Sequence, residues 1–67
     1  MVVRVFFPSH DPAFDYLGQD REFGAMPRAG EEVRIISSGE VYRVDRAGHI
    51  EDGPRFIPSI WVSPITD

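Results

Sequence analysis

The stretch Met26–Arg46, MPRAGEEVRIISSGEVYRVDR, decides the fold that the sequence predicts. Val33 and Ile35 alternate with polar residues, which places one apolar row on one face of a strand. The same alternation resumes with Tyr42 and Val44, after a Ser-Ser-Gly sequence that is typical of a short hairpin turn. We therefore predict an antiparallel hairpin that is buried on one side.

Two further strands are predicted at the two ends of the sequence. Val2–Phe7 is rich in β-branched and aromatic residues, which favour strands. It carries one fully apolar row, consisting of Val3, Val5 and Phe7. Ile60–Ile65 is the last strand, and because Pro64 cannot donate a ladder hydrogen bond, we expect this strand to lie at a sheet edge or to end early.

Between the first strand and the hairpin, the sequence favours one short helical turn. Asp11 followed by Pro12 is typical of a helix start, since the side chain caps the first turn and proline suits its first position. Gly18 is a natural stop, so the turn should end at about Leu17.

The segment Ala47–Ser59 contains two glycines and two prolines and is expected to be mostly loop, with a short strand at His49–Glu51. Four or five short antiparallel strands with one helical turn predict a small, mostly β barrel or roll of SH3-like type. An α+β ubiquitin-like roll is the alternative, and it would need a longer helix. Residues 1–67 should form a single domain.

Composition limits the possible classes of protein. The 67 residues include no cysteine, which removes disulfides and thiolate metal sites. No apolar run is long enough to span a membrane, and Val2–Phe7 is too short for a signal peptide, so we expect a cytoplasmic protein. The net charge is −4, and all seven basic residues are arginines.

Catalytic and metal sites are not predicted. His10 lies near Asp11 and Asp15, and His49 lies near two acids, which is material for acid–base chemistry. However, no nucleophile stands out, and the spacings match neither structural zinc sites nor calcium loops. We therefore expect no enzyme activity, no metal and no cofactor.

An acidic segment, His10–Glu22, offers the best material for binding a protein. It displays two aromatic residues among several acids, and aromatic residues dominate interface hot spots. The acids would steer the segment toward a partner with a basic surface. The predicted partner-binding residues are Phe14, Tyr16, Asp11, Asp15 and Asp20. In the alternative, Phe14 is core, Tyr16 covers the barrel mouth and the acids only maintain solubility.

A second predicted interface lies on the terminal strands, because both carry apolar residues on both faces. If these strands pair, their outer row makes an apolar patch that a small monomer rarely exposes. Either the helical turn covers this patch or a second copy does. We accordingly predict a homodimer, with an interface formed by Val2, Phe6, Trp61 and Ile65.

Arginines of the central hairpin give a third hypothesis, from another class of function. Arg34, Arg43 and Arg46 could bind a small anionic ligand or nucleic acid. However, acids are interspersed among them and the chain is acidic overall, so we expect nucleic acid not to be the partner.

The succession PRAGEEVRI, GEVYRV and IWV, within Pro27–Val62, resembles small β proteins of tailed-phage and prophage genomes. The resemblance rests on Gly30, Val33, Ile35, Tyr42 and Val44. It implies a small β-barrel from a mobile element that acts as an accessory protein and binds, modulates or inhibits a host or defence protein. A structural component of the virion neck or tail is the alternative. The resemblance assigns no functional residue.

Overall fold

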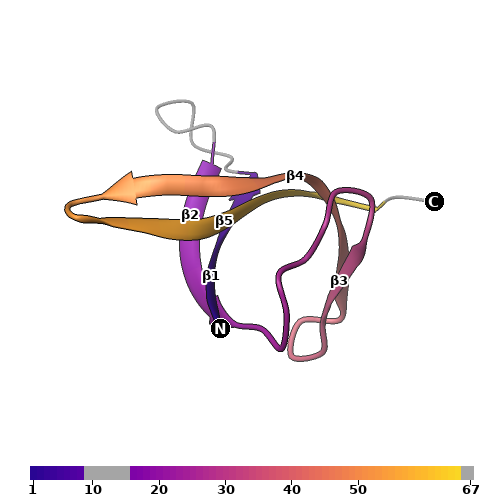
Figure 1. Cartoon of the computed structure of the whole chain (residues 1–67). Helices are drawn as coiled ribbons and strands as arrows, with labels where there is room; N and C mark the ends of the chain where they lie inside the picture. Colours follow the sequence, from indigo (N-terminus) through magenta and orange to yellow (C-terminus); the bar gives the residue numbers. More distant parts are fainter. Residues whose placement is uncertain (9–15, 66–67) are drawn as a thin grey trace.

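The computed structural model describes residues 1–8 and 16–65. Its five strands form one curled sheet, a half-barrel, in the order β2-β1-β5-β4-β3 (Figure 1). The strands are β1 (Val2–Pro8), β2 (Tyr16–Glu22), β3 (Glu32–Ile35), β4 (Glu40–Asp52) and β5 (Arg55–Pro64). The predicted mostly β fold of barrel or roll type is therefore confirmed.

The central hairpin is present as predicted. β3 and β4 pair antiparallel, with Val33 opposite Tyr42, so the two apolar rows share one face. Gly39 closes the connecting turn with a φ of 74°, a left-handed conformation that glycine adopts without steric cost. The amide of Gly39 donates to the carbonyl of Ile35 at 2.8 Å, which fixes the turn.

The prediction of a wholly antiparallel sheet is wrong, because β1 and β5 pair in parallel. Of the two alternatives expected for the last strand, the edge position is wrong, since β5 lies in the middle of the sheet. Its prolines are tolerated there because the parallel ladder covers only Ser59–Trp61. Pro58 and Pro64 flank that ladder, so neither removes one of its hydrogen bonds. The strand does end at Pro64, as predicted.

β2 replaces the C-terminal end of the predicted helical turn. Tyr16 and Leu17 belong to this strand, which pairs antiparallel with β1 along its whole length. The predicted turn residues Asp11–Asp15 lie outside the described residues. Pairing with β1 overrides the weak local preference for a helix, as tertiary context commonly does. No helix occurs in residues 1–8 and 16–65.

The segment predicted as loop forms a long hairpin arm instead. β4 continues to Asp52 and β5 begins at Arg55, joined by a tight turn in which Gly53 has a φ of 62°. Figure 1 shows this arm projecting past β1 and β2. Gly53 and Pro54 form that turn, whereas Gly48 and Pro58 occupy paired positions opposite Ser59 and His49. The turn-forming character of the sequence is therefore confirmed at Gly53 and Pro54 only.

The core lies on the concave face of the sheet, which we call the inner face. It consists of five buried aliphatic side chains, Val3, Val5, Val44, Ile60 and Val62. Larger side chains pack around them, namely Phe7, Phe23, Met26, Val33 and Tyr42. Because side chains alternate along a strand, the residues between the core positions point to the opposite, outer face.

Candidate functional site

Phe6 and Trp61 stack on the outer face of the sheet. They are direct partners in the parallel ladder between β1 and β5, so their side chains point the same way. Their ring centres lie 5.2 Å apart with an angle of 12° between the planes. This offset stacking is a favourable arrangement for two aromatic rings.

Arg46 extends this stack onto β4. Its guanidinium carbon lies 4.5 Å from the centre of the Trp61 ring, within cation–π range. Arg46 reaches this position through a β-bulge: Val44 pairs with Val62, and Arg46 pairs with the preceding residue, Trp61. In a regular strand, Val44 and Arg46 would share a face. The extra residue, Asp45, lets Val44 enter the core while Arg46 covers Trp61.

Gly18 completes the arrangement on β2. It lies opposite Phe6, and a Cβ atom at this position would come within 3.0 Å of the Phe6 ring. Glycine therefore allows the Phe6 ring to lie close to the β2 backbone. Together, Gly18, Phe6, Trp61 and Arg46 form a row across four strands, which we call the aromatic ladder.

An ion-pair network borders the ladder on β1 and β2. The Nε atom of Arg4 donates to Asp20 at 2.9 Å, and its Nη2 atom lies 3.4 Å from a carboxylate oxygen of Asp52, at the end of β4. The hydrogen bond from Arg4 lowers the pKa of Asp20 below its ordinary value. The network connects the arm to the sheet and gives the surface around the ladder a mixed charge.

The predicted partner-binding residues are only partly described. Phe14, Asp11 and Asp15 lie outside the described residues, and Tyr16 lies at the start of β2. Asp20 is exposed, and its carboxylate pairs with Arg4 within the sheet. The proposal of an acidic binding segment therefore stays a prediction.

The predicted oligomer interface is divided between two places. Phe6 and Trp61 come together in the ladder, and Val2 lies on the same face with 51% of its surface exposed. Ile65 instead lines a cavity at the end of the sheet.

The sequence predicts a functional role for three members of the ladder, Phe6, Trp61 and Arg46, but it assigns Arg46 to a separate anion site. It interprets Gly18 as a helix stop, although a lone glycine inside a strand can also indicate the close approach of a side chain.

The three arginines proposed to bind an anion have different surroundings. Arg46 covers Trp61. Arg34 lies 3.5 Å from a carboxylate oxygen of Glu32, and Arg43 is the cross-strand partner of the same glutamate. A carboxylate therefore competes with an anionic ligand at two of these positions.

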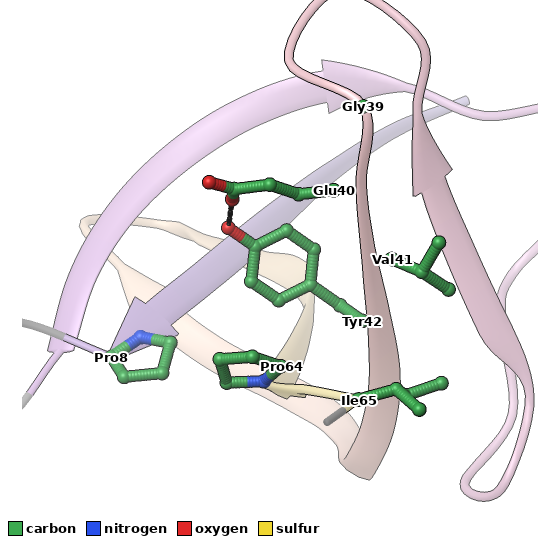
Figure 2. Close-up of a pocket in the computed structure, with 7 residues that line it drawn as sticks. All are labelled: Pro8, Gly39, Glu40, Val41, Tyr42, Pro64 and Ile65. Carbon is green, nitrogen blue, oxygen red and sulfur yellow. Dashed lines mark hydrogen bonds between the residues drawn. The ribbon is translucent and has the colours of Figure 1, made fainter. Parts of the chain in front are cut away.

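The cavity at the end of the sheet has a volume of about 450 Å³ (Figure 2). The ends of β1 and β5 and the start of β4 meet there, and the lining residues are Pro8, Gly39, Glu40, Val41, Tyr42, Pro64 and Ile65. The Tyr42 hydroxyl donates a hydrogen bond to the Glu40 carboxylate. This bond raises the pKa of Tyr42, with a smaller contribution from burial.

Residues 1–8 and 16–65 contain no group of three or more histidines and acids placed to hold a metal ion. His10 lies outside these residues, and His49 faces Pro58 across the arm. Within the same described part of the chain, no helix has the length and apolar character needed to cross a membrane. Comparisons with protein-family models, curated proteins and solved structures gave no match.

Proposed function

We propose that this chain is a non-enzymatic protein-binding module and that the aromatic ladder is its contact surface. The observation that supports this proposal is the position of Trp61 on the outer face, between the ring of Phe6 and the guanidinium of Arg46. Tryptophan and arginine are among the residues most enriched in interface hot spots. Here they are partly exposed on a sheet rather than buried in the core.

The ladder is also preorganised for binding. Its members come from four hydrogen-bonded strands, and each side chain is restrained by its neighbour in the row. A rigid aromatic surface loses little conformational freedom when a partner docks, which leaves more of the contact energy for affinity.

Charge favours a protein over nucleic acid as the partner. Stacked aromatic residues also suit the bases of single strands, but those sites lie in basic grooves that follow the phosphate backbone. This chain has a net charge of −4, and Asp20 and Asp52 border the ladder. Both carboxylates already pair with Arg4, so a phosphate would have to displace them from this arginine.

The proposed biological setting follows from the resemblance to small phage β proteins. In this proposal the module is an accessory protein of a phage or mobile element, works in the host cytoplasm, and modulates or inhibits a host or defence protein. A small single domain with a rigid contact face is suited to blocking a surface of another protein.

Affinity capture from host lysate tests the proposal with two matched charge reversals. Arg46→Glu removes the cation from the ladder, whereas Arg34→Glu makes the same change on β3, away from it. We expect the wild type and Arg34→Glu to capture the same protein and Arg46→Glu to lose it, with both variants folded by circular dichroism. Equal capture by both variants would contradict a role for the ladder.

A second copy of the chain is the competing occupant of the ladder. Sedimentation of the purified wild type over a concentration series identifies it. A dimer that Arg46→Glu dissociates and Arg34→Glu preserves would assign the ladder to self-association through the predicted dimer residues Phe6 and Trp61.

A further inference from the structure

The cavity at the end of the sheet combines apolar walls with a single charged group. Among its seven lining residues in the described part of the chain, only Glu40 carries a charge, and the others are prolines, aliphatic residues, a glycine and Tyr42. Figure 2 shows the rings of Pro8, Pro64 and Tyr42 near one another, with the Glu40 carboxylate beside the Tyr42 hydroxyl. The cavity thus has the features of a ligand site, in which apolar walls surround a few placed polar groups.

Tyr42 fixes the position of this carboxylate. Its ring and the ring of Phe7 pack edge to face with their centres 5.0 Å apart, and its hydroxyl donates to Glu40. One carboxylate oxygen is occupied by that bond, and a carboxylate has further acceptor sites. Glu40 is therefore held at the cavity with capacity for another donor.

We infer that this cavity binds an arginine side chain of the protein partner. A guanidinium is planar, weakly hydrated and able to stack on rings, and it donates hydrogen bonds to carboxylates. The proline and tyrosine rings would contact its plane and its methylene groups, while Glu40 would accept from a guanidinium nitrogen. The inference extends the proposed function to a second contact, and it agrees with the expected basic surface of the partner.

The charge of the cavity argues against an anionic ligand. Within residues 1–8 and 16–65, no arginine lines it. An anion would meet the Glu40 carboxylate at short range, and no cation among these lining residues would offset the repulsion. A cationic side chain is the complementary ligand, and its apolar stem suits the rings of Pro8, Pro64 and Tyr42, which lie on the same side of β4 as Glu40 (Figure 2).

Short peptides test this inference on the isolated full chain, independently of the ladder. The probes are acetyl-Gly-Arg-Gly-amide, its lysine analogue and its citrulline analogue, which replaces the guanidinium by a neutral urea of similar shape. Amide resonances are followed up to roughly 10 mM peptide, where a contact worth about 3 kcal/mol is already detectable. We expect saturable shifts at Glu40, Tyr42 and Ile65 with the arginine peptide, weaker binding of lysine and no binding of citrulline.

Matched variants locate the site. Glu40→Gln should weaken the arginine peptide about fivefold, the effect of losing an exposed ion pair of about 1 kcal/mol. Tyr42→Phe keeps the ring but removes the hydrogen bond that holds Glu40, so it should cause a smaller loss. Glu51→Gln, on the arm, should have no effect.

Three results would overturn the inference: no saturable shifts, equal binding of the citrulline peptide, or an unchanged affinity in Glu40→Gln. Equal affinity for the lysine peptide would contradict selection of a guanidinium. Failure of this inference can be distinguished from failure of the proposed function. The lysate capture tests the ladder through Arg46, whereas the peptide titrations test only the cavity.

Discussion

Val44 and Arg46 are separated by one residue on β4 but lie on opposite faces of the sheet. Val44 is buried in the core, whereas Arg46 lies over Trp61 on the outer face. The bulge residue between them, Asp45, produces this arrangement, and its carboxylate accepts a hydrogen bond from Ser63 at 3.0 Å.

The position of the bulge predicts different outcomes for two single-residue deletions in β4. Removing Asp45 should restore a regular ladder in which Val44 still pairs with Val62 and Arg46 with Trp61, so the chain should fold and keep the near-ultraviolet signal of Trp61. Removing Ala47 should instead place Asp45 over Trp61 and turn Arg46 toward Ile60. We expect that variant to lose the contact between Arg46 and Trp61 and, with it, the wild-type near-ultraviolet signal. The same Trp61 signal in the two deletions would contradict the assigned register.

The Phe6–Trp61 stack should contribute measurable coupling to stability. A double-mutant cycle with Phe6→Leu and Trp61→Leu keeps both sites apolar and isolates the interaction between the rings. We expect a coupling free energy of about 1 kcal/mol, the usual value for an aromatic pair. Urea unfolding of the four proteins measures it, and strictly additive effects would show that the rings do not interact in solution.

Acid should weaken the fold partly through Asp20. Arg4 lowers its pKa in the folded state, so its contribution is complete above the ordinary aspartate pKa and is lost as the pH falls through the lowered value. Urea midpoints measured from about pH 6 to about pH 2 should therefore decline less steeply in Asp20→Asn than in the wild type. Glu51→Gln serves as the control. An Asp20→Asn profile parallel to that of the wild type would rule out the ion pair as a stabilising contact.

Tyr42 should titrate above the ordinary tyrosine pKa of 10.0, because it donates to Glu40 and is partly buried. A folded pKa that is raised stabilises the fold below the ordinary value, and this contribution is lost as the pH rises through the raised one. Ultraviolet titration of Tyr16→Phe, which leaves Tyr42 as the single tyrosine, measures this pKa directly. Glu40→Gln in the same background should lower it, and an unchanged pKa would contradict the hydrogen bond.

The alternation of apolar and polar residues along the sequence predicted the hairpin and the core face of β1. In the hairpin, one apolar row is Val33 and Ile35 and the other is Tyr42 and Val44. In β1, the apolar row includes the buried residues Val3 and Val5. β2 could not be predicted in this way. Gln19 and Arg21, which lie opposite the core residues Val5 and Val3, are polar and exposed at the sheet edge, so this part of the strand shows no apolar row.

The ladder was only partly predictable for a related reason. The outward direction of Phe6 and Trp61 follows from the alternation within each terminal strand, and their stacking requires only that these strands pair. The position of Arg46 depends on a bulge, and no residue in the sequence around Asp45 identifies one.

The cavity is built from three strand ends that are distant in sequence, so only the fold brings Pro8, Tyr42 and Pro64 together.

Fluorine NMR of Trp61 tests the ladder as a contact surface most directly, because Trp61 is the single tryptophan of the chain. The chain is labelled with 5-fluorotryptophan and titrated with the unlabelled protein that it captures from lysate, and a dilution series of the chain alone controls for self-association. We predict that the single free resonance is replaced by a shifted one at saturation, and that Arg46→Glu shows no such change at equal partner concentration. A resonance that stays unchanged in the saturated complex would contradict binding through the ladder.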